Sequence, residues 1–298
     1  MRHGIKFVLL SLITALIAAS SASAQTTLRF KFTKGEKLQY VMEQKMKMVM
    51  NIMNMEIDTK MNMSMDMAWN IIDVNSDGSA KLEIKVTRAK MSMDGATGQV
   101  EVDSNQKEEP DDAIGKIFSQ IVKATGKMEI TGTMQTTGEM KDLKVSEETL
   151  KAMKNLPGAE KFGDALSPES FKSMASNLVF PMEPVTKGKT WTNKSETKTA
   201  IGKTTTESTY TFEGTVEKGG VTLEKISIKP VMKIEPDPKS NIKVEVKDAK
   251  GSGTIFFNNK TGQMVETVIN QQMQMQLGVG GLSFDQTIDQ TVSVKLKK

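Results

Sequence analysis

The stretch that decides the fold is residues 40–70, which read YVMEQKMKMVMNIMNMEIDTKMNMSMDMAWN. Apolar and polar residues alternate along it, which is the period of a β-strand with one buried face. The methionines lie on even positions up to Met50 and on odd positions from Met53 onward. A change of phase of this kind requires a turn or a bulge near residues 52–54. We therefore predict two long antiparallel strands that share a methionine-lined face.

The same alternation covers most of the chain, so we expect a mainly β fold with minor α content. Glycine-containing turns such as Ser76-Asp77-Gly78 separate the alternating segments and favour hairpins. Strands in the first half are expected at residues 28–32, 38–52, 55–74, 80–93 and 127–143.

Helical periodicity is confined to the middle of the sequence. Apolar residues at helical spacing behind an acidic start predict an amphipathic helix over residues 111–124. A helical connector is expected over residues 145–180, and the dipeptide Pro157-Gly158 breaks it into two helices.

Several patterns occur twice in the same order, which indicates an internal repeat. For example, a Thr-Lys-Gly turn precedes a long strand at residues 33–36 and again at residues 186–189. The predicted fold consists of two related antiparallel β modules, residues 25–144 and 181–298, on either side of the connector. Together they would form a sandwich, a half-barrel or an open barrel with inserted helices.

Residues 1–24 have the pattern of a secretory signal peptide. Arg2 and Lys6 precede an apolar run at residues 7–19, and small residues precede the expected cleavage point before Gln25. The apolar run is shorter than the roughly 20 residues of a membrane span, and no later run approaches that length. We therefore expect an exported protein of the bacterial cell envelope, periplasmic or extracellular, without a transmembrane span.

The composition excludes most familiar catalytic and metal sites from the mature chain. His3 is the only histidine and lies in the expected signal peptide, and cysteine is absent. Disulfides, imidazole bases and the usual zinc ligands are therefore excluded. The net charge of +4 is spread along the chain without a basic stripe, so we expect no nucleic-acid partner. We expect a protein that is not an enzyme and has no cofactor; a carboxylate-based hydrolase would need two acids facing one cleft.

The methionine-rich hairpin has three interpretations. Methionine fills irregular cores, so the first is simple packing. Methionine also suits adaptable apolar binding surfaces, so the second is a groove for a lipid or another apolar molecule. Thioethers bind Cu(I), which gives the third. The candidate ligand-binding residues are Met46, Met48, Met50, Met61, Met63, Met65, Met67 and Trp69.

Two hypotheses for the function follow from these interpretations. The leading one is a non-enzymatic envelope protein that binds a lipid or another apolar small molecule. The alternative is a structural scaffold with a closed core that interacts with other envelope proteins.

Residues 73–78 read DVNSDG, which matches the opening of a calcium-binding loop. The twelfth position of such a loop must supply a bidentate acid, and here it is Ile84. We therefore predict an ordinary hairpin turn at this position.

The chain also resembles a known family. It is an exported sequence that opens with LRFKFTKGE at residues 28–36 and carries PVTKGKTW at residues 184–191. In these features it is similar to the uncharacterised bacterial envelope proteins of the DUF6263 family, and the likeness covers most of the mature chain. The resemblance implies the fold and the compartment. It implies no activity, because the family has no assigned function and no catalytic residues.

Overall fold

The methionine-rich hairpin is present: its first strand ends at Ile52 and its second begins at Met55, on either side of the change of phase in the sequence. Strands β1 (Lys37–Ile52) and β2 (Met55–Val74) pair antiparallel, with Met42 opposite Met65 and Met46 opposite Met61. Side chains directly opposite each other in such a pair point to the same face of the sheet. The methionines of both strands therefore line one face, as predicted.

The computed structural model describes residues 25–52, 55–96, 98–156, 178–199, 202–237, 240 and 242–297. The expected signal peptide and residues 157–177 of the expected connector lie outside the described residues. The predicted central helix is confirmed as α1 (Ala113–Thr125), and the start of the connector forms α2 (Glu147–Lys154). The other elements are β3 (Ala80–Gly95), β4 (Gly98–Asp103), β5 (Glu129–Met134), β6 (Met140–Val145), β7 (Thr190–Thr199), β8 (Gly202–Lys218), β9 (Val221–Pro236), β10 (Ile242–Asn258), β11 (Gln263–Val279) and β12 (Leu282–Leu296).

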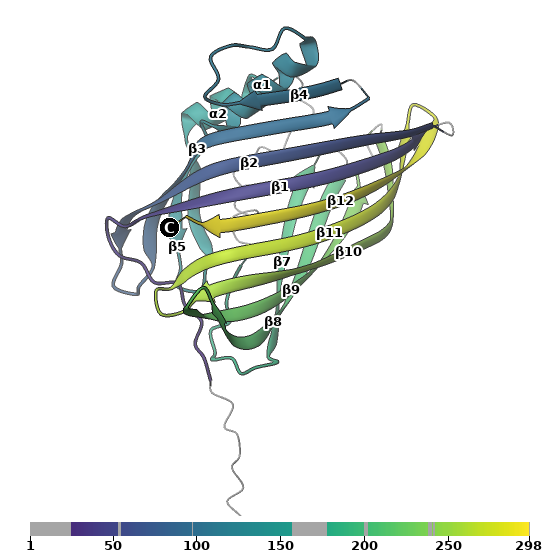
Figure 1. Ribbon diagram of the computed structural model, residues 1–298. Helices are drawn as coiled ribbons and strands as arrows, with labels where there is room; N and C mark the ends of the chain where they lie inside the picture. The colour runs from purple at the N-terminus through teal and green to yellow at the C-terminus, as the bar shows by residue number, and fades with distance from the viewer. Residues whose placement is uncertain are drawn as a thin grey trace, which may run out of the picture.

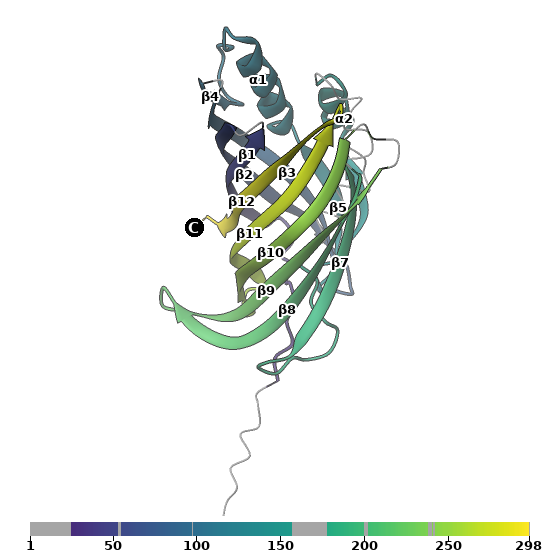
Figure 2. The same ribbon diagram turned by 90° about the vertical axis from the view of Figure 1, so that its right-hand side faces the viewer.

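The described strands form one continuous antiparallel sheet rather than the two sheets of a sandwich. The order is β6-β5-β3-β2-β1-β12-β11-β10-β9-β8-β7, and β4 pairs with the end of β3. The sheet curls so that β5 and β7 lie behind β1 and β12 (Figure 1), which gives an open half-barrel. The turned view shows the same curvature from the side (Figure 2). The mainly β, half-barrel prediction is thus confirmed.

The two halves of the chain share this sheet because β1 pairs with β12. Their register runs from Tyr40 opposite Leu296 to Asn51 opposite Asp285. The division into two related modules stays a prediction, and the two modules would be joined edge to edge at this pair.

The strand predicted at residues 28–32 is not formed. This segment crosses one end of the half-barrel instead, together with residues 178–185, and we call the two segments the end cap. The amide of Phe30 donates to the carbonyl of Thr136 in the β5–β6 turn at 2.8 Å. The amide of Lys31 donates to the carbonyl of Gly262 in the β10–β11 turn at 3.3 Å. Because its backbone bonds alternate between distant turns, the segment has no continuous strand partner.

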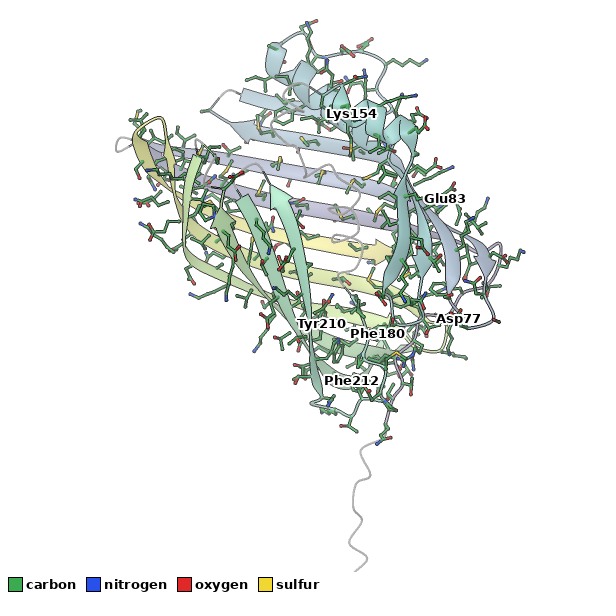
Figure 3. All side chains as sticks on the ribbon, turned by 180° about the vertical axis from the view of Figure 1, so that it is seen from behind. Asp77, Glu83, Lys154, Phe180, Tyr210 and Phe212 are labelled. Atoms are coloured by element: carbon green, nitrogen blue, oxygen red, sulfur yellow. The ribbon has the colours of Figure 1, made fainter. Side chains whose placement is uncertain are left out.

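The main hydrophobic core lies under the end cap. The ring of Phe30 stacks on Phe180 with the centroids 5.3 Å apart and meets Phe257 edge-on at 5.2 Å. Tyr210 and Phe212 lie at the same end of the molecule (Figure 3). These aromatic side chains come from the end cap, β8 and β10, so they tie the cap to the sheet. The other buried members of this cluster are Leu28, Ile71, Ala80, Leu82, Met134, Met140, Val185, Ile226, Ile228 and Ile255.

Replacing the central ring of this core should loosen the closed end of the half-barrel. We expect Phe30→Ala to lower the free energy of unfolding by about 3–5 kcal/mol, since it leaves a cavity among packed rings. Urea denaturation measures the change. The matched control is Phe256→Ala on the opposite face, where Lys218 Nζ lies 3.9 Å from the ring centroid. A loss for Phe256→Ala as large as that for Phe30→Ala would contradict this account of the core.

Candidate ligand-binding site

The predicted site residues all lie on the concave face, but the structure divides them into groups. They belong to β1 and β2. On each strand they lie an even number of residues from a buried residue, Tyr40 on β1 or Ile71 on β2, so their side chains point to the same face. Sulfur-bearing side chains are visible on this side of the sheet (Figure 3). The face is therefore continuous along the hairpin, while the surroundings of each residue differ along its length.

The β2 methionines pack beneath helix α1. Met65 is buried, and Met61, Met63 and Met67 surround it as half-buried neighbours. They contact a cluster to which β3, β4 and α1 contribute, with Val122 as the helix residue at its centre. For this part of the hairpin the contacts are those of an ordinary core.

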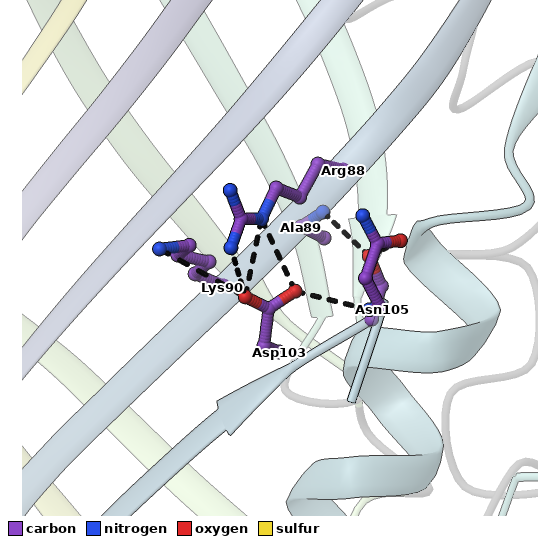
Figure 4. A network of polar contacts seen from close by, with 6 residues as sticks. Arg88, Ala89, Lys90, Asp103 and Asn105 are labelled. Atoms are coloured by element: carbon purple, nitrogen blue, oxygen red, sulfur yellow. Dashed lines mark hydrogen bonds and ion pairs between the residues drawn. The ribbon is translucent and has the colours of Figure 1, made fainter. Parts of the chain in front are cut away.

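A polar network joins β3, β4 and the start of the loop that leads to α1 (Figure 4). Arg88 of β3 binds Asp103 of β4 through Nη2 at 2.6 Å and Nε at 3.1 Å. The Ala89 amide donates to Ser104 Oγ at 3.0 Å, which holds the loop that leads to the helix. A Cβ on Gly126, at the end of α1, would lie 2.6 Å from Ser104 Cβ. The end of the helix therefore packs closely against the start of the loop that leads to it. Hydrogen bonds from Arg88 lower the pKa of Asp103.

Met46 borders a different environment, a cavity of about 240 Å³ on the concave face. Its space arises from small residues on β10, because Ala249 lies opposite Met273 and Gly251 lies opposite Gln271. A Cβ on Gly251 would lie 2.5 Å from Pro230 Cγ, so only glycine lets β9 and β10 approach this closely. The lining residues are Met46, Pro230, Met232, Ala249, Lys250, Gln271, Gln272, Met273, Ile288 and Gln290.

The remaining candidates lie outside this cavity. The sulfur of Met48 accepts a hydrogen bond from Gln286 Nε2, and Met50 lies opposite Ile57. Trp69 packs on Tyr40 near the end cap, with their ring centroids 5.0 Å apart, and its indole N–H has no hydrogen-bond partner. The predicted set therefore does not form a single site.

Sequence reasoning missed the cavity residues contributed by β9 to β12. Met273 and Ile288 are half-buried and follow the same alternation as the hairpin methionines, so the face on which they lie could have been predicted from the sequence. Their position opposite Met46 depends on the register of β1 with β12 and of β11 with β12.

The sequence motifs with metal-binding character do not assemble in the described residues. In these residues no three or more histidine, cysteine, aspartate or glutamate side chains lie close enough together to hold a metal ion. In the turn at residues 73–78, Asp77 Oδ1 accepts from the Ser79 amide at 2.9 Å and Asp73 pairs with Lys34 at 2.9 Å. These acids serve the turn, as predicted. The thioether copper interpretation stays a prediction.

Membrane-spanning helices were also not expected from the sequence. In the part of the chain that the structure describes, no helix has the length and apolar character needed to cross a bilayer.

A family model, described as "Family of unknown function (DUF6263)", matches residues 77–264. The chain belongs to the DUF6263 family. This result confirms the family that the sequence motifs suggested. No curated protein matches the chain. Because the family description states no activity, the concave face is the guide to function.

Three solved structures that match the chain are all less than 10% identical to it, with TM-scores below 0.5. Lipovitellin, in a structure described as showing lipid–protein interactions, is 8% identical with a TM-score of 0.46; the match covers 90% of this chain and 26% of that chain. The chain thus spans about a quarter of lipovitellin. A putative outer membrane lipoprotein-sorting protein domain from Vibrio parahaemolyticus is 9% identical, with coverages of 87% and 86% and a TM-score of 0.16. The translocator domain of the autotransporter NalP from Neisseria meningitidis is 6% identical, with coverages of 88% and 89% and a TM-score of 0.20.

Removing the carboxylate of Asp103 should loosen α1 above the β2 methionines. The Asp103 side chain is 22% exposed, so solvent screening limits the loss from Asp103→Asn to about 1 kcal/mol or less. Because the folded-state pKa is lowered, the stabilisation is present above the ordinary aspartate pKa of about 4 and is lost as pH falls through the folded value. Hydrogen-exchange protection factors of β4 and α1, measured at pH 7 and pH 3, test both statements.

The control is Asp94→Asn, at the other end of the β3–β4 pair. Asp94 is exposed, and no ion pair involves it among the described residues. Protection of α1 that is equally sensitive to both substitutions would contradict a specific role for Asp103.

Proposed function

We propose that this DUF6263 protein is a non-enzymatic protein of the cell envelope that binds a lipid or another apolar molecule on the concave face of its half-barrel. The single observation that supports this proposal best is the cavity beside Met46, whose walls are mostly aliphatic and thioether side chains. Ligand sites of this kind are concave and largely apolar, with a few polar groups.

The size of the cavity limits what it can hold. Its volume of about 240 Å³ lies below the roughly 300 Å³ of a typical drug-sized site. We therefore propose that the cavity takes one segment of an acyl chain rather than a whole lipid. The rest of the ligand would follow the apolar concave face.

Export is the second part of the proposal. Residues 1–24 have the charge and hydropathy pattern of a signal peptide, which would place the protein in the periplasm or outside the cell. An exported carrier without histidine or cysteine has no ready metal or thiol chemistry, which suits binding better than catalysis.

The scaffold hypothesis remains the second candidate, because one observation favours it. The β2 methionines contact Val122 and the other cluster residues beneath α1, and so they are occupied by the protein's own side chains. In a scaffold the cavity beside Met46 would be a packing defect without a ligand.

Filling the cavity separates these two functions. We expect Ala249→Leu to weaken binding of the apolar fluorescent probe N-phenyl-1-naphthylamine at least about tenfold, because the added methyl groups occupy space that the probe needs. A fluorescence titration measures the affinity, and a thermal melt shows that the variant is folded. The control is Asn270→Leu, an exposed position on the convex face of the adjacent strand β11.

Unchanged probe binding by a folded Ala249→Leu variant would rule out this cavity as the binding site. Native mass spectrometry of the protein purified from its own envelope provides the complementary test. A co-purified lipid supports the carrier, stoichiometric copper supports the thioether interpretation, and the bare chain supports the scaffold.

A further inference from the structure

A line of glutamine side chains crosses the apolar concave face beside the cavity. Gln44 Nε2 of β1 donates to Gln290 Oε1 of β12 at 3.1 Å, and Gln290 Nε2 donates to Gln271 Oε1 of β11. All three side chains are part-buried. They point inward because Gln290 is directly opposite both Met46 and Gln271. This row and Gln286 are polar positions on a face that is otherwise lined mainly by methionine, aliphatic and aromatic residues.

The row is directional and ends at the cavity. Gln44 and Gln290 use their amino groups as donors within the row, so the amino group of Gln271 is its last donor. No residue in the described ranges accepts a hydrogen bond from that group. Gln271 and Gln290 both line the cavity together with Pro230, whose ring packs closely on Gly251 opposite Gln271.

A donor placed in an apolar cavity selects a ligand with an acceptor. The Gln271 amino group reaches solvent, since the indole nitrogen of Trp69 is the one buried side-chain nitrogen or oxygen without a partner in the part of the chain that the structure describes. A purely apolar ligand that displaces this solvent leaves the donor unpaired at a cost in free energy, whereas a ligand with an acceptor restores the hydrogen bond. The row carries no charge, so an ionised ligand would have no counter-charge there. Lys250 also lines the cavity, but its ammonium group is 2.6 Å from Asp248 and is already paired.

We infer that the cavity recognises a neutral acyl ester or amide, whose carbonyl oxygen accepts a hydrogen bond from the Gln271 amino group. The inference rests on the proposed function and names the chemical class of its ligand. The acyl chain lies along Met273, Ile288 and Met46, and the carbonyl lies at the end of the glutamine row.

The test compares ligands that share a ten-carbon chain and differ in their polar group, on variants that differ in the hydrogen-bond donor. Decane, methyl decanoate and sodium decanoate each displace N-phenyl-1-naphthylamine from the wild type and from Gln271→Leu. We expect Gln271→Leu to weaken methyl decanoate about five- to tenfold, the loss of one neutral hydrogen bond, and to leave decane unchanged within about twofold. The matched control is Gln274→Leu on the same strand, which is exposed on the convex face and should change neither affinity.

Each outcome decides one question. If the wild type fails to bind the probe at all, the proposed function is wrong. If the probe binds but Gln271→Leu weakens ester and alkane equally, the carrier stands and the carbonyl inference is overturned. Decanoate binding more tightly than its methyl ester overturns the neutral class in favour of a carboxylate. Gln290→Leu provides a second variant, because it removes the residue that orients Gln271, and it should reproduce the ester-specific loss.

Discussion

Pairing between the first and last long strands is the constraint on which the rest of the structure depends. β1 and β12 lie side by side although Gln44 and Gln290 are 246 positions apart in the chain. Without this pair the sheet would separate into two parts, each with an additional unpaired edge. With it, the described strands form one surface wide enough to curl into a half-barrel. Because the two strands are far apart in the sequence, pairing them closes a long loop and lowers the entropy of the chain. The backbone hydrogen bonds and side-chain contacts of the β1–β12 pair must offset this loss.

The apolar face of a curled sheet is covered by other parts of the protein or is left free to bind a ligand. At one end, Phe30 and Phe180 of the end cap pack against Phe257 of the sheet. Near the other end, α1 covers the β2 methionines and is held in place by Arg88 and Asp103. The cavity lies between these covered regions, where small residues on β10 leave space. Function is therefore sought at a part of the concave face where the protein's own side chains leave a cavity.

The cavity is lined by uncharged side chains except for Lys250, which is paired with Asp248. Thioether and aliphatic side chains supply dispersion contacts, and their flexibility suits ligands of variable shape. The amides of Gln44, Gln290 and Gln271 supply directional hydrogen bonds without the desolvation cost of a buried charge. Under the proposed function, a surface of this composition would distinguish ligands by their shape and by the position of one acceptor.

The sequence by itself determined the local structure: the hairpin over residues 40–70, the central helix and the mainly β class. These depend on periodicity and turn chemistry within a few neighbouring residues. Only the tertiary structure decided that residues 28–32 cap the sheet instead of joining it, because their partners Thr136 and Gly262 are distant in sequence. The cavity and the glutamine row were equally hidden. Each depends on the register of strands from opposite halves of the chain, and a shift of one residue would turn every one of these side chains to the other face.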